Sequence, residues 1–75
     1  MFYIELNIAS CTVSFVHTLE EIGKKYGVQI IHHGWDRLVF GIDLDTEIAK
    51  FEDELKDAAK HEAGISLYDL MVWSI

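Results

Sequence analysis

The chain has 75 residues and a mass of 8.6 kDa, which suffices for one small domain over residues 1–75. Thirteen Asp and Glu residues against six Lys and Arg give a formal net charge of −7. Binding to nucleic acids or anionic membranes depends on cationic patches, so this charge disfavours both kinds of partner. Hydrophobic residues make up 51% of the chain, which excludes intrinsic disorder.

Cysteine usage and the N-terminal residues bear on the compartment. Cys11 is the single cysteine, so no disulfide forms within one chain. A small domain without such crosslinks is typical of a reducing environment. Residues 1–5 lack the basic start and the apolar stretch of a signal peptide, and no run approaches the roughly 20 apolar residues that span a bilayer. We therefore expect a cytoplasmic protein.

The first part of the chain predicts a strand followed by a helix. Apolar residues alternate with polar ones over residues 2–8, which is the period of a strand with one buried face. Ser10 and Thr12 then offer capping oxygens, and apolar positions recur at helical spacing over residues 16–26. Gly27 supplies the left-handed conformation that commonly ends a helix.

The middle of the chain predicts a hairpin and a second helix. Residues 28–33 and 37–44 are two strands, joined by a turn between them. Asp45 or Thr46 is the expected cap of a helix whose apolar positions run from residue 48 to residue 63.

Gly64 ends the second helix, and residues 65–75 are expected as a final extended segment with a break near Asp69. The resulting order, β-α-β-β-α-β, resembles the ferredoxin-like superfold. This resemblance implies an α+β domain with two helices on one face of a four-stranded antiparallel sheet, and a last strand at the edge beside the first. It rests on element order along the whole chain. Because the superfold hosts unrelated functions, it transfers no site residues.

The C-terminal run is apolar on both faces of the expected strand. A sheet covered on one side needs only one apolar face, and no proline or lysine blunts this edge. We therefore predict that a second polypeptide covers the strand and the open face of the sheet. The alternative is that the C-terminus folds back and Trp73 fills a gap in the core. The predicted interface residues are Leu70, Met71, Val72, Trp73, Ile75 and Tyr3.

Acidic residues concentrate in the second helix, with eight carboxylates against three lysines over residues 43–62. One interpretation is phosphate mimicry, in which this face occupies a basic nucleic-acid site of another protein. The other is a solvated face, because helical spacing permits the ion pairs Glu47–Lys50, Glu52–Lys56, Asp53–Lys56 and Asp57–Lys60. The candidate partner-facing residues are Glu47, Asp53, Glu54, Asp57 and Glu62.

Patterns of catalytic or metal-binding residues do not assemble along the chain. His32 and His33 are neighbours on a strand and point to opposite faces, so they do not easily share one ion. Cys11 precedes the first helix, where the helix dipole can lower a thiol pKa, but His17 lies off its face and offers no positioned base. We predict no catalytic residue, no metal site and no cofactor.

These features favour a non-catalytic acidic protein-binding module. We expect a homodimer that acts as a regulator or inhibitor by docking on another protein, a role that small proteins of phages and mobile elements can serve. The alternative is a small-molecule-sensing domain that resembles ACT-type regulatory modules, which share this element order and pair through their sheets. Their ligand sites lie between subunits near the first strand–helix connection, here residues 8–12. A weaker option is a minimal enzyme that uses Cys11.

Overall fold

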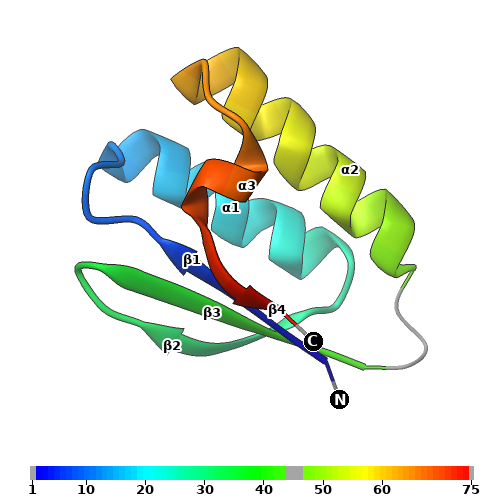
Figure 1. Cartoon of the computed structure of the whole chain (residues 1–75). Helices are drawn as coiled ribbons and strands as arrows, with labels where there is room; N and C mark the ends of the chain where they lie inside the picture. Colours follow the sequence, from blue (N-terminus) through cyan, green and yellow to red (C-terminus); the bar gives the residue numbers. More distant parts are fainter. Residues whose placement is uncertain (1, 44–46, 75) are drawn as a thin grey trace.

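The computed structural model describes residues 2–43 and 47–74, with side chains as far as residue 72 (Figure 1). It is an α+β fold with a four-stranded antiparallel sheet in the order β2-β3-β1-β4 and three α-helices among the described residues. The elements are β1 (Phe2–Asn7), α1 (Val13–Lys25), β2 (Gln29–His33), β3 (Arg37–Ile42), α2 (Ile48–Ala58), the π-helical turn η1 (Ala59–Ala63), α3 (Leu67–Leu70) and β4 (Met71–Ser74).

Both long helices lie on one face of the sheet, and the opposite face has no helix over it (Figure 1). The register sets Ile4 of β1 opposite Phe40 of β3, and both side chains are buried under the helices. Phe51 of α2 meets Phe40 edge to face, with ring centroids 5.3 Å apart. This edge-to-face geometry matches the positive ring edge of one aromatic to the negative face of the other. The core is therefore a single layer between the helices and one side of the sheet.

Local signals account for both ends of α1. The hydroxyl oxygen of Thr12 accepts a hydrogen bond of 3.1 Å from the Phe15 N–H, which satisfies a donor that the helix itself leaves open. Of the two predicted caps, Thr12 is therefore the one used. Gly27 has a φ of 69°, in the region where a side chain is strained, and it ends the helix as predicted.

The second helix extends to residue 63 as predicted, but its last turn is π-helical. The Gly64 N–H donates to the Ala59 carbonyl five residues before it, which is the spacing of a π-helical turn, and Gly64 has a φ of 65°. The two predicted caps, Asp45 and Thr46, lie outside the described residues. Glu47 occupies the cap position and makes no hydrogen bond there through its side chain.

The segment after Gly64 differs from the predicted extended run. Ser66 accepts a hydrogen bond from the Tyr68 N–H and starts the one-turn helix α3. Leu67 and Leu70 are three residues apart, so one helical turn directs both side chains into the core. The prediction of Leu70 on a strand was wrong for this reason. As predicted, β4 lies at the sheet edge beside β1.

Both edge strands of the sheet contain a bulge. In β2 the register with β3 shifts at Ile31, and in β4 the register with β1 shifts at Val72. Each of these side chains is 49% exposed. A bulge interrupts the regular row of N–H and C=O groups that an added strand would need. The sheet edges are thus protected by backbone geometry, in the absence of proline and lysine.

The space around Gly23 shows how closely α1 packs on the sheet. A Cβ added there would lie 2.8 Å from Cε1 of Phe40, whose ring is fully buried against Phe51 and has no space to move. Alanine gains about 1 kcal/mol in helix propensity over glycine, but overpacking costs about 1–3 kcal/mol. We expect Gly23→Ala to lower the free energy of unfolding by up to about 2 kcal/mol in urea titrations. With Phe40→Leu as background the loss should shrink, whereas a stabilised single variant would contradict this packing.

Candidate functional site

The predicted interface residues Leu70, Met71 and Val72 differ in how deeply they are buried. Leu70 is 8% exposed and belongs to the core, so it does not contribute to a surface. Met71 packs partly against the core and lines a cavity of about 320 Å³ beneath α2. Val72, at the bulge, remains half exposed. Of the run that the sequence predicted to be apolar on both faces, Leu70 is therefore in the core, Met71 is partly buried and Val72 is half exposed.

The remaining predicted interface residues lie at the C-terminus and on β1. The backbone of Trp73 pairs with Glu5, while its side chain and all of Ile75 lie outside the described residues. Tyr3 is half-buried opposite Gly41, on the side of the sheet away from the helices. Of the predicted residues with described side chains, Tyr3 is therefore half-buried on the sheet face away from the helices, and Val72 is half exposed at the sheet edge.

The face of the sheet without helices is electrically balanced. Among the residues of β1, β2 and β3 on this side, Glu5 and Arg37 are the formally charged ones, and the Arg37 Nε lies 3.2 Å from a Glu5 carboxylate oxygen. Register and alternation assign to this open sheet face Tyr3, Glu5, Asn7, Gln29, His32, Arg37, Val39 and Gly41.

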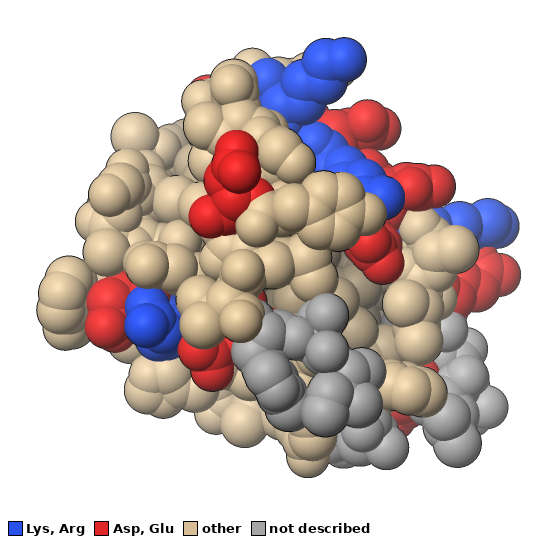
Figure 2. Space-filling model, in the orientation of Figure 1, with Lys and Arg blue, Asp and Glu red and all other residues tan. Residues whose placement is uncertain are grey.

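Carboxylates along α2 are interleaved with lysines (Figure 2). Two of the predicted ion pairs are present, Glu47–Lys50 at 3.0 Å and Glu52–Lys56 at 3.6 Å. Within the described residues, no ion pair joins Asp53 to Lys56 or Asp57 to Lys60. The Lys56 ammonium instead lies 5.0 Å from the ring centre of Tyr68, as well as beside Glu52.

Two acidic residues that lack a cation on their own turn are bonded to α1. Glu54 accepts hydrogen bonds from the Lys25 ammonium at 2.6 Å and from the Tyr26 hydroxyl at 2.8 Å. Glu62 accepts one from the Thr18 hydroxyl at 3.2 Å. These contacts join the two long helices across their exposed side. They favour a structural and solvated role for much of the acidic face.

The hydrogen bonds to Glu54 make the stability of the fold depend on pH. Lys25 and then Tyr26 hold the pKa of Glu54 below its ordinary value by hydrogen bonding to the charged carboxylate. A carboxyl with a lowered folded-state pKa stabilises the fold above its unfolded-state pKa, and this contribution disappears as the pH falls through the folded-state value. We expect Glu54→Gln to reduce the acid dependence of urea stability, and carbon NMR titration of wild type to show the lowered pKa. Asp53→Asn is the matched control and should leave that dependence unchanged.

Cys11 is not activated by its position before α1. Partial burial raises the pKa of its thiol, so the reactive thiolate is disfavoured at neutral pH. The helix is capped by Thr12, while the Cys11 N–H donates to the Ile8 carbonyl at 3.0 Å. Two cavities of about 330 and 370 Å³ flank this β1–α1 connection, and Cys11 lines both.

A groove at the β2–β3 turn was missed by the sequence reasoning. Trp35 is 81% exposed and Val13 is 87% exposed, and both line the smaller of the two cavities beside the β1–α1 connection. The signal available in the sequence was a tryptophan inside a tight hairpin turn, where there is no interior to receive it. The residues that define this Trp35 groove here are Cys11, Val13, His17, Glu20, His33 and Trp35.

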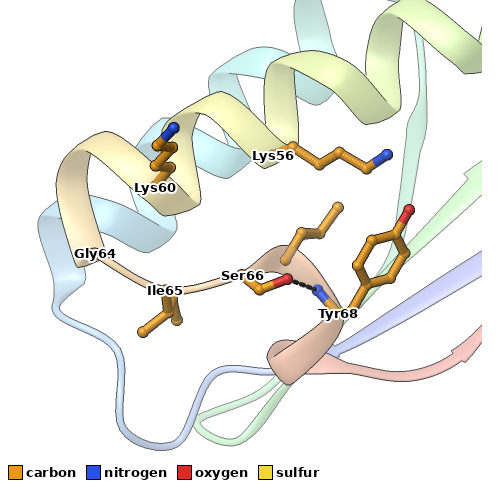
Figure 3. Close-up of a pocket in the computed structure, with 7 residues that line it drawn as sticks. Lys56, Lys60, Gly64, Ile65, Ser66 and Tyr68 are labelled. Atoms are coloured by element: carbon orange, nitrogen blue, oxygen red, sulfur yellow. Dashed lines mark hydrogen bonds between the residues drawn. The ribbon is translucent and has the colours of Figure 1, made fainter.

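A wider hollow of about 580 Å³ lies between the end of α2 and the loop before α3 (Figure 3). Lys56 extends toward Tyr68 across it, and Ser66 bonds the Tyr68 N–H at its base (Figure 3). The Tyr68 hydroxyl donates to Glu52 at 3.3 Å. Lys56, Ser66 and Tyr68 are thus engaged with groups of the chain itself, and Lys60 also lines the hollow.

Comparison of the chain with protein-family models, with curated proteins and with solved structures finds no match. None of the described helices is long and apolar enough to cross a membrane. In the described part of the chain, no three His, Cys, Asp or Glu side chains are grouped to hold a metal ion. Function is therefore inferred from the surfaces themselves.

Proposed function

We propose that the protein is a non-catalytic protein-binding module of the cytoplasm, a homodimer that acts as a regulator or inhibitor by docking on another protein. The observation that carries the proposal is the open sheet face. It has no helix over it, and its two formally charged side chains, Glu5 and Arg37, compensate one another.

Charge favours this face for self-association. Two chains of net charge −7 repel one another, and the carboxylates of α2 increase that repulsion wherever helices approach helices. Packing sheet face against sheet face brings neutral surfaces together and turns both α2 helices outward. Tyr3 and Val39 supply aromatic and β-branched surface near the middle of that contact.

Backbone geometry favours face packing over edge pairing. The bulges at Ile31 and Val72 disrupt the two strand edges through which a continuous sheet would form. The half-exposed Val72 side chain remains available at the rim of the open sheet face. The order of the four strands and the two long helices along the chain supports a ferredoxin-like fold, in which α3 is an additional helical turn.

A non-catalytic role is supported by the state of Cys11. Its pKa is raised by burial, which is the opposite of what a thiol nucleophile requires. For the acidic helix, bonding of Glu54 and Glu62 to α1 supports a solvated and structural face more than phosphate mimicry.

Val39→Lys tests the dimer. The side chain points away from the core, so the variant should fold, but it places two new charges in a face-to-face contact. We expect wild type to have twice the chain mass in light scattering after size exclusion, and Val39→Lys to have the single-chain mass. Val13→Asp, at the separate Trp35 groove, is the control and should remain dimeric. A wild-type monomer at high micromolar concentration would exclude this assembly.

The ACT-like alternative is favoured by one observation. The two cavities beside residues 8–12 lie where ACT-type modules bind small ligands. A ligand that binds the folded state raises the melting temperature, by about 10 °C or more for a domain of this size when its concentration reaches about 100 times its Kd. We expect such a rise for at least one amino acid or nucleotide in a thermal-shift screen if this alternative holds. A screen without any rise would eliminate it.

A further inference from the structure

Two large apolar side chains, Trp35 and Val13, are exposed together at one end of the molecule. The β2–β3 turn and the β1–α1 connection meet there, at the left of Figure 1, and both side chains line the Trp35 groove of about 330 Å³. Single exposed apolar residues are ordinary, but a tryptophan beside a second apolar side chain in a concave surface is typical of a binding site.

The backbone around Trp35 is held in place on both sides. The Gly34 N–H donates to the Arg37 carbonyl at 2.9 Å, and the Ile8 N–H donates to the Asp36 carbonyl at 2.9 Å. Val13 is the first residue of α1, directly after the Thr12 cap. A groove with an ordered backbone loses little conformational entropy when it binds a partner.

The polar side of the groove is acidic. The Glu20 side chain is 22% exposed, and its carboxylate lies 3.3 Å from Nδ1 of His33. His17, also in the groove, lies 3.7 Å from Glu21 on the same helix. No Lys or Arg lines the groove among the described residues. Lys24, on the same helix, pairs with Glu21.

We propose that the Trp35 groove binds a basic segment of a partner protein, with an arginine or lysine side chain over the Trp35 ring and its charge paired with Glu20. A planar guanidinium stacks on an indole ring and forms two hydrogen bonds to a carboxylate, so arginine fits this pair of groups best. An apolar neighbour in the segment contacts Val13. The proposal rests on the proposed docking function, for which it names the surface and the partner chemistry.

Charge complementarity selects this occupant over two others. Nucleic acid is repelled by the net charge of −7. A second copy of the chain has the same net charge, and several of its cations, including Lys25, Arg37 and Lys50, are already paired with carboxylates. A basic segment is attracted to the whole molecule and is then held by the groove.

The test uses a short synthetic peptide of alternating arginine and leucine, with a peptide of glutamate and leucine as its counterpart. Trp73→Phe leaves Trp35 as the single indole, so its fluorescence reports binding. Cys11 is the single thiol and lines the groove, so its alkylation rate is an independent readout. We expect saturable binding of the arginine peptide alone, with a shift in Trp35 emission and slower alkylation of Cys11.

Variants distinguish the groove from general attraction to an acidic protein. Trp35→Ala should weaken binding at least about tenfold, because tryptophans dominate the binding energy of such contacts. For this variant, which lacks the fluorescent residue, binding is measured by the alkylation rate of Cys11. Glu20→Gln should weaken it about tenfold at low salt and reduce its salt dependence. Asp53→Asn removes one charge elsewhere, and Tyr68→Ala removes another exposed aromatic; both should bind like wild type.

Equal losses for Glu20→Gln and Asp53→Asn, or full binding by Trp35→Ala, would overturn the groove proposal. So would equal binding of the glutamate peptide. Val39→Lys, which tests the dimer, should bind the arginine peptide normally. Failure of the dimer and failure of the groove are therefore separate results.

Discussion

The contact between Phe40 and Phe51 is the interaction on which the arrangement of layers depends. It joins the central strand β3 to α2, and Gly23 of α1 lies close enough to the same ring that no Cβ fits between them. One aromatic side chain of the sheet thus meets both long helices. Because this core is on one side only, the other side of the sheet lies open, and the dimer proposal follows from that asymmetry.

Charge is distributed in keeping with the same asymmetry. The carboxylates of the helical side bond to lysines, to a tyrosine and to a threonine, and Glu54 joins α2 to α1 in this way. On the open sheet face Glu5 and Arg37 neutralise one another. A strongly acidic chain therefore presents one balanced surface, together with edges that its bulges protect from added strands.

The Trp35 groove arises where two connections meet. The β1–α1 connection contributes Cys11 and the β2–β3 turn contributes Trp35, while Val13 and Glu20 come from α1 and His33 from β2. Loops that rest on an ordered scaffold are common binding sites, because side chains at loop tips are exposed while their backbone is fixed. The groove and the open sheet face lie on different parts of the domain.

Local signals in the sequence determined the strands β1, β2 and β3, a hydroxyl cap before α1 and the glycine ends of both long helices. These features depend on alternation, helical spacing and backbone preference, which neighbouring residues encode. Tertiary structure decided the α3 turn that buries Leu70, the bond between Glu54 and Lys25, the bulges at the edges and the groove at Trp35. Each of these depends on residues distant in sequence, whose contact forms when the helices pack on the sheet and compete for a limited interior.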